Sequence, residues 1–218
     1  DGTDSTDASN GGETNLSPGM ITGTPPYDPN HGDEWVSDSH GSTFIFVSGG
    51  PTTIGADSDT ASSSREQPAH QIDVSGFWIQ QTETTNAQYT ACVDADICTP
   101  PDNSLWDQAD YAQHPVQDIS WPQAVAYAQW VGARLPSEAE WEKACRSGDE
   151  RLYPWGDQAP SEENDGLANI NNLVGDTTAV GTYPDGATAL GLLDMSGNVW
   201  EWTSTCLLYT SPSPRDLA

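Results

Sequence analysis

The sequence predicts an α+β domain with few short strands, about three helices and much irregular structure. Three observations support this fold class. Short runs of β-branched and aromatic residues come first, two helix starts with capping patterns follow in the middle, and regular periodicity fades after Tyr153. No repeat at a fixed period is visible. We therefore expect one domain whose second half is held together by turns rather than by regular elements.

Two segments are expected to form strands. Thr43–Ser48 (TFIFVS) is rich in strand-forming residues and is followed by a glycine pair, which predicts a strand and a turn. Gln71–Gln80 (QIDVSGFWIQ) predicts two strands separated by the Ser-Gly dipeptide at its centre. Both segments precede the helical part of the chain.

The first predicted helix is Asn86–Ala95, which begins after Thr85 as N-cap. We expect its inner face to consist of Ala87, Tyr89, Ala91 and Val93.

The two following helices have clearer start signals. Ser120 and Gln123 form a capping-box pattern, and Pro122 lies in the first turn, where its missing N–H does no harm. The apolar face that follows consists of Ala124, Tyr127, Ala128 and Val131, and Gly132 ends this helix. A second capping box, Ser137 with Glu140, predicts a helix whose inner face carries Trp141, Ala144 and Cys145 and which ends at Gly148.

Composition narrows the classes of partner. The 218 residues carry a net charge of −27, so nucleic acid and anionic membranes, which need a positive surface, are not expected to bind. Crowded carboxylates instead attract divalent cations. No apolar run approaches the roughly 20 residues that span a bilayer, so we expect no membrane insertion.

Three segments are expected along the chain. Residues 1–42 are rich in Asp, Gly, Ser, Thr and Pro and contain no Lys or Arg, which predicts a disordered acidic linker. Residues 43–204 form the domain. Residues 205–218, which end in CLLYTSPSPRDLA, are expected to be a non-native tail. The acidic linker weakly favours an exported protein, whether periplasmic, secreted or on the cell surface.

The four cysteines have different expected roles. Cys92 and Cys98 are close enough for a local disulfide, although a reduced pair fits the spacing as well; the linker favours the disulfide. Cys145 is expected to be a small core residue. Cys206 belongs to the predicted tail, so we do not expect it to be a nucleophile.

Eight sequence blocks resemble the formylglycine-generating-enzyme, or sulfatase-modifying factor, family. They occur in the family order between about Thr43 and Ser204. The blocks are TFIFVSGG (Thr43–Gly50), EQPAH (Glu66–His70), QTETTNAQY (Gln81–Tyr89), HPV (His114–Val116), ISW (Ile119–Trp121), GARLPSEAEWEKA (Gly132–Ala144), YPWGD (Tyr153–Asp157) and GLLDMSGNVWEW (Gly191–Trp202).

This resemblance implies a C-type-lectin-like fold and an oxidase that converts a cysteine of a sulfatase-type partner to formylglycine with oxygen. Family members carry a reactive, copper-binding cysteine pair after the GNVWEW block, and the sequence after Thr205 does not match that segment. We therefore expect this fragment to be inactive, and copper to be relevant only if the parent protein has the pair. The alternative is a non-catalytic extracellular module that binds a protein or a carbohydrate.

The resemblance also implies two calcium sites. One would use Asn169, the carbonyl of Ile170, Asp176 and the carbonyl of Thr178. The other would use Asp194, the carbonyls of Gly197 and Val199, and Glu201. Carboxylate, amide and main-chain oxygens in tight turns are the ligands that calcium collects. The alternative is that these residues only form turns through their own hydrogen bonds.

Other conspicuous residues have structural interpretations. His70 and His114 are expected to form hydrogen bonds within the fold, because the four histidines show no HxxH or HxH spacing. Glu140 is expected to cap its helix and Arg134 to pair with an acidic neighbour. Six tryptophans are expected to pack in the core, namely Trp121, Trp130, Trp141, Trp155, Trp200 and Trp202.

Overall fold

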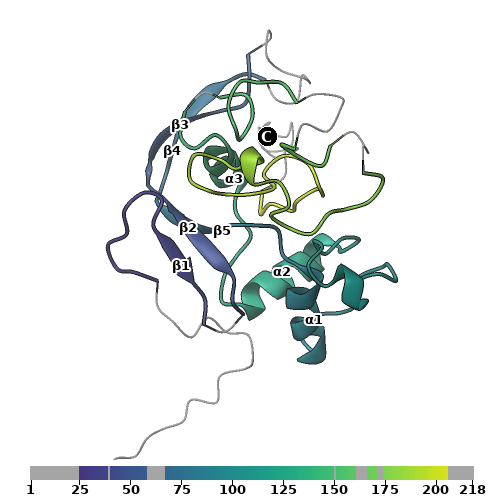
Figure 1. Cartoon of the computed structure of the whole chain (residues 1–218). Coiled ribbons are helices and arrows are strands. Elements are labelled where there is room, and N and C mark those ends of the chain that lie inside the picture. Colours follow the sequence, from purple (N-terminus) through teal and green to yellow (C-terminus); the bar gives the residue numbers. More distant parts are fainter. Residues whose placement is uncertain are drawn as a thin grey trace, which may run out of the picture.

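The computed structural model describes residues 25–38, 40–57, 67–149, 151–160, 166–170 and 174–205. Five short strands precede three α-helices, and long irregular loops follow (Figure 1). This order confirms the predicted α+β class. The elements are β1 (Glu34–Val36), β2 (Thr43–Val47), β3 (Gly50–Ile54), β4 (His70–Val74), β5 (Phe77–Gln80), α1 (Asn86–Asp94), the 3₁₀ helix η2 (Ala109–Tyr111), α2 (Trp121–Trp130), α3 (Glu138–Cys145) and the 3₁₀ helix η3 (Pro184–Gly186).

The strands form two small antiparallel sheets. One has the order β1-β2-β5, with Ile45 opposite Ile79, and the other pairs β3 with β4. The predicted strands correspond to β2, β4 and β5. Sequence reasoning missed β3, and it also missed β1, which lies inside the segment assigned to the linker. The ordered part thus begins before residue 43, while residues 1–24 lie outside the described residues.

Helix α1 begins at the predicted N-cap, where Thr85 and Gln88 form a capping box. Its predicted inner face is right for Tyr89, which is buried, and for Val93, which packs against the same buried cluster. It is wrong for Ala87 and Ala91, which are exposed, while Asn86 and Cys92 are buried. Cys92 forms a disulfide with Cys98, as favoured from the sequence.

Helices α2 and α3 begin with the two predicted capping boxes. The predicted apolar face of α2 is buried throughout, and Val131 and Trp130 at its end are buried with it. On α3, Ala144 is fully buried, and Lys143 is buried too. The ammonium group of Lys143 donates to the carbonyl of Gly50 on β3 (2.9 Å).

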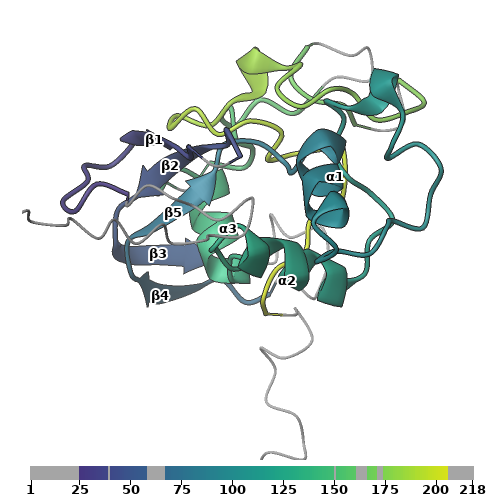
Figure 2. The ribbon, with the colours of Figure 1, turned by 90° about the horizontal axis from the view of Figure 1, so that it is seen from below.

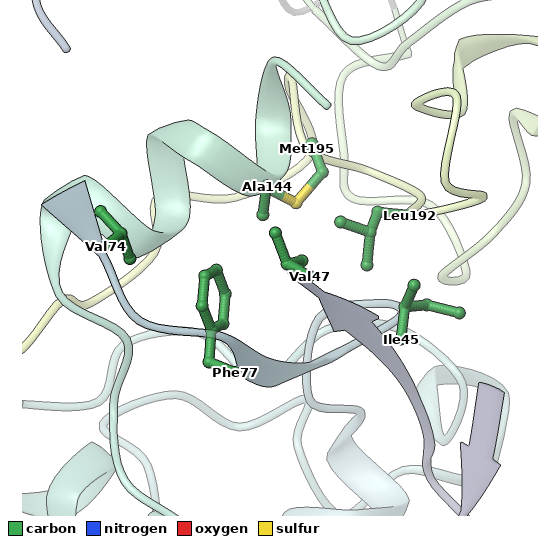
Figure 3. Packing of buried hydrophobic residues seen from close by; sticks show 7 residues of the cluster. All are labelled: Ile45, Val47, Val74, Phe77, Ala144, Leu192 and Met195. Carbon is green, nitrogen blue, oxygen red and sulfur yellow. The ribbon is translucent and has the colours of Figure 1, made fainter. Parts of the chain in front are cut away.

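The main core lies between the sheets, α3 and the last irregular segment. Figure 3 shows side chains from these three sources pointing toward one another. Leu192 and Met195 come from the irregular segment, so that segment is part of the core. Seen from below, the strands lie on one side, α1 and α2 lie on the other, and the late loops cover one edge (Figure 2). The cluster consists of Ile45, Val47, Val74, Phe77, Ala144, Leu192 and Met195.

No helix in the described part of the chain is long and apolar enough to cross a membrane.

Candidate metal centre

The two sets of predicted calcium ligands lie side by side in the irregular half of the domain. Gly197 packs directly on the backbone of Asn169, since a Cβ atom at Gly197 would lie 2.5 Å from the Asn169 carbonyl oxygen. Gly197 has φ of +102°, a conformation that favours glycine. The main-chain N–H of Asn198 donates to the same carbonyl (2.9 Å). A glycine is therefore required where the two turns meet.

Asn198 connects these turns to a third segment. Its side-chain oxygen accepts hydrogen bonds from the N–H of Thr178 (2.9 Å) and from the amide of Asn169 (3.2 Å). Its side-chain amide donates to the carboxylate of Glu83 (2.8 Å) and to the carbonyl of Thr178 (3.2 Å). Asn198 also has a left-handed backbone, with φ of +58°, which asparagine adopts more readily than most residues. One side chain thus fixes the relative positions of three segments.

Glu83 is a functional candidate that sequence reasoning did not single out. It is 7% exposed and lies just before α1, with one oxygen facing Asn198 and the other accepting from the N–H of Val199 (3.3 Å). Burial, together with the nearby carboxylates of Glu201 and Asp194, raises the pKa of Glu83 to about 9. The sequence did contain a signal for this pair, because Glu83 and Asn198 both lie within blocks that resemble the family.

The ligand set around Asp194 retains free oxygens. The Asp194 carboxylate accepts from the N–H of Gly181 through one oxygen (2.6 Å), and the Glu201 carboxylate accepts from the indole of Trp141 through one oxygen (3.2 Å). Among the described residues, no donor contacts the second oxygen of either carboxylate or the carbonyls of Gly197 and Val199. These free oxygens are of the kind that calcium binds.

Negative charge accumulates at this set. Burial raises the pKa of Asp194. Burial of the carboxylate group, together with Asp194, raises the pKa of Glu201 to about 7, although Glu201 as a whole residue is exposed. No lysine or arginine of the described residues forms an ion pair with Glu83, Asp194 or Glu201. Glu83 and Asp194 are buried, and a buried carboxylate calls for a proton or a compensating positive charge. The residues around Asp194 therefore offer oxygens and charge of the kind that a calcium ion needs.

The set around Asn169 is more fully occupied by protein donors. The two carboxylate oxygens of Asp176 accept from the hydroxyl of Tyr111 (2.6 Å) and from the N–H of Thr177 (2.7 Å). The Asn169 amide donates to the carbonyl of Asp176 (2.9 Å), and the carbonyl of Thr178 is bonded to Asn198. This arrangement resembles the turn-forming alternative more closely than a ready ligand set.

Within the part of the chain that the structure describes, no three or more His, Cys, Asp and Glu side chains gather closely enough to hold a metal ion. This result counts side chains only, and the predicted set around Asp194 has two carboxylates and two main-chain carbonyls. Both predicted calcium sites therefore stay predictions.

The structural interpretations of other residues are mostly confirmed. His70 and His114 form hydrogen bonds within the fold, and Arg134 pairs with the capping residue Glu140 (2.6 Å). Cys145 lies partly buried against the core, where burial raises the pKa of its thiol to about 12, so no thiolate forms near neutral pH. Cys206 lies outside the described residues.

The prediction for the tryptophans is wrong for three of six. Trp130 is buried, but Trp121 and Trp202 are 43% and 47% exposed, and Trp200 is fully exposed. The indoles of Trp121 and Trp202 donate to the carbonyls at positions 203 and 119, so these rings are held in place at the surface. They create an exposed aromatic surface beside the start of α2. A sequence block alone cannot tell which of its aromatic residues face outward.

Comparisons with known proteins agree with this architecture. Residues 34–212 match the sulfatase-modifying factor enzyme 1-like domain. Hercynine oxygenase of Mycolicibacterium smegmatis is 36% identical over 201 residues, a match that covers 76% of this chain and 46% of that protein. The formylglycine-generating enzyme of Mycobacterium tuberculosis is 34% identical over 205 residues, covering 64% of this chain and 67% of that enzyme.

A solved structure, PvdO from Pseudomonas aeruginosa, shares the fold with a TM-score of 0.68 at 23% identity, covering 82% of this chain and 76% of PvdO. The C-type-lectin-like fold expected from the sequence agrees with these relatives. The chain spans about half the length of the hercynine oxygenase that it matches. The blocks, the fold and the match over residues 34–212 together show that the chain belongs to the sulfatase-modifying factor enzyme 1-like family.

Proposed function

We propose that this domain is the scaffold of an oxidase of the formylglycine-generating type, whose parent protein acts on a cysteine of a sulfatase-type partner. The relative named formylglycine-generating enzyme, which the match covers to two thirds of its length, supports this function. A second relative is named an oxygenase, which supports oxidative chemistry more generally.

The observation that carries the proposal is the exposure of Trp200 and Trp202, of which Trp202 is held by its hydrogen bond to the carbonyl of Ile119. Both follow the turn that Asn198 and Glu83 anchor, and both present indole surface to solvent. Exposed aromatic surface on a rigid support is typical of sites that bind another protein. A partner protein could therefore dock there.

The described residues do not provide the reactive thiol. Their one free cysteine is Cys145, whose buried thiol contacts the carbonyl of Met195 (3.7 Å). Cysteine oxidation with copper requires thiolates, because the thiolate is the metal ligand. A copper-binding cysteine pair would have to come from residues outside those described, and copper would supply the oxygen chemistry there.

The test is conversion of a sulfatase-derived peptide that contains one cysteine. The parent protein and the present chain are each incubated with the peptide, copper(I), a thiol reductant and air, and formylglycine is detected by mass spectrometry. We expect conversion by the parent and none by this chain. A parent protein that binds copper but makes no formylglycine would contradict the oxidase function.

We also propose that calcium stabilises the domain through Asp194, Glu201 and the carbonyls of Gly197 and Val199. The free oxygens and the uncompensated charge support this site. A ligand present at 100 times its Kd stabilises the folded state by about 2.7 kcal/mol. For a domain of this size that amounts to a rise in Tm of roughly 5–11 °C.

Chelation by EDTA should therefore lower the Tm, and adding calcium should restore it. Asp194→Asn should abolish most of this response. Asp176→Asn tests separately whether the set around Asn169 binds calcium. An unchanged Tm in EDTA would refute both sites.

A non-catalytic extracellular binding module is the second candidate function. The Cys92–Cys98 disulfide favours it, because disulfides persist mainly in exported proteins. The same disulfide weakly supports export of the oxidase. Binding of a partner by a parent protein that lacks oxidase activity would favour this second function.

A further inference from the structure

A cavity of about 610 Å³ shares no lining residue with the predicted calcium ligands or with the exposed tryptophans. The segment before β2, the link between β5 and α1, the first turns of α1 and the end of α2 converge on it. Trp130 lines it at one end of α2, whereas Trp121 lies at the opposite end of the same helix. Cavities of this size are typical of small-molecule sites.

The described residues that line the cavity carry no formal charge. None of them is Asp, Glu, Lys or Arg, although the chain contains 33 acidic residues. His40 is the only titratable side chain among them, and burial lowers its pKa, which keeps the imidazole neutral near pH 7. A cation would find no carboxylate in this wall. An anion would find no positive group and would meet the negative field of the whole protein.

The polar part of the wall consists of hydroxyl and amide groups that can both donate and accept. Gln88 is fixed by the capping box, because its side-chain oxygen accepts from the N–H of Thr85 (2.9 Å). Its amide donates to the hydroxyl of Ser42 (2.8 Å), and that hydroxyl contacts Nδ1 of His40 (2.7 Å). Gln81 is held by the carbonyl of Gly191 (3.0 Å). These contacts hold the polar groups in place before any ligand arrives.

The Ser42 hydroxyl is buried, accepts from the Gln88 amide and shares a hydrogen bond with Nδ1 of His40, so it holds the imidazole in place. Nε2 of His40 has no hydrogen-bond partner within the described part of the chain. The indole N–H of Trp130 also lacks a partner there. Both nitrogens are covered, so a ligand reaches them only after a small shift of the wall.

The other side of the cavity is apolar. Ala87 and Ala91 lie one turn apart on α1 and face it, together with Val180. This explains why two residues expected in the core of α1 are instead exposed. A ligand for this cavity must therefore combine several hydroxyl groups with an apolar face and carry no charge.

We propose that this cavity binds one neutral sugar unit. Each sugar hydroxyl both donates and accepts, as do the hydroxyl and amide groups of this wall, and the C–H face of the ring matches the alanines. The site is independent of the oxidase function, because it contains neither the exposed tryptophans nor the predicted calcium ligands.

The test uses the ¹⁵N-labelled chain and the methyl glycosides of glucose, galactose, mannose and N-acetylglucosamine at millimolar concentrations. We expect at least one of them to shift the indole N–H signal of Trp130 and the side-chain amide signals of Gln81 and Gln88 in a saturable manner. The indole signals of Trp121 and Trp202 should stay unchanged. Glucuronate, an acidic sugar, should bind at least about tenfold more weakly, a difference in binding free energy of about 1.4 kcal/mol or more.

Ala91→Leu fills the cavity from an exposed helix position and should abolish the shifts. Ala109→Leu, at an exposed alanine of η2 outside the cavity, is the matched control and should leave them intact. Equal melting temperatures of the two variants show that both fold. The proposal is overturned if none of the four glycosides moves the Trp130 signal, if Ala91→Leu responds as the control does, or if glucuronate binds equally well.

Discussion

The substitution Asn198→Ala tests whether one side chain holds the irregular half of the domain together. Asn198 accepts from Thr178 and donates to Glu83 through the two shortest of its side-chain bonds, 2.9 and 2.8 Å. Alanine removes both, together with the longer contacts to Asn169 and to the carbonyl of Thr178. It also places a less tolerant residue at φ of +58°.

The expected loss of stability follows from these contacts. A buried group left without its partner costs about 1–3 kcal/mol, so the two short bonds account for about 2–6 kcal/mol. The left-handed backbone adds about 1 kcal/mol for alanine. A total of about 3–7 kcal/mol corresponds to a fall in Tm of roughly 6–28 °C for a domain of this size.

Urea unfolding and calorimetry measure this loss, each in EDTA and in calcium. Asn198→Gly separates the two causes, because glycine accepts the left-handed backbone and should be destabilised by about 1 kcal/mol less than alanine. Asn30→Ala is the control, since Asn30 is exposed and its side chain makes one long contact. If Asn198→Ala unfolds within about 0.5 kcal/mol of this control, the assigned role of Asn198 is refuted.

Three further predictions concern single side chains. Gly197→Ala should destabilise the folded domain by several kcal/mol, because its Cβ would meet a main-chain oxygen at 2.5 Å. Gly175→Ala, which also has positive φ but lies in open space, should cost only about 1 kcal/mol. Equal losses of stability in urea unfolding would contradict the close approach at Gly197. Arg134 lowers the pKa of Glu140 to about 2, so the pair contributes stability above pH 4.5 that is lost as the pH falls toward 2. Glu140→Gln should therefore lower the free energy of unfolding by about 1–3 kcal/mol at pH 7, a value reduced because Arg134 is exposed to solvent. The Tm of this variant should also fall less steeply than that of the parent chain as the pH is lowered below 4.5. Iodoacetamide at pH 8 should leave Cys145 unmodified in the folded protein and label it in urea, as read by peptide mapping; rapid labelling of the folded protein would contradict its burial.

Local sequence patterns were sufficient to locate an element wherever one helix turn or one strand contains the residues that define it. The capping boxes at Ser120 and Ser137 placed two helix starts, and the run of strand-forming residues at Thr43 placed β2. β1 escaped detection because three residues are too short for a pattern, and only pairing with β2 defines them. The inner face of α1 depended on the partners that cover it, and the sequence does not display those partners.

The candidate site shows the same division between local and long-range information. The GLLDMSGNVWEW block pointed to Asp194, Gly197 and Glu201, because its resemblance to the family implies a calcium site there. Glu83 precedes Asn198 by 115 positions, so only the fold brings the two together. Buried polar networks of this kind depend on every member being paired, and their composition cannot be read from one stretch of chain.

The burial of Glu83 connects the fold of the domain with its proposed function. A carboxylate that lies under the turn and beside two others destabilises a metal-free domain unless it holds a proton. A calcium ion at Asp194 and Glu201 would offset that charge and favour the same turn that presents Trp200 to solvent. Calcium would then act on partner binding through the order of this turn, without touching the partner. This coupling predicts that EDTA abolishes partner binding while the circular dichroism spectrum still shows the strands and α1 to α3. Partner binding that persists in EDTA would show that the metal does not control the binding surface.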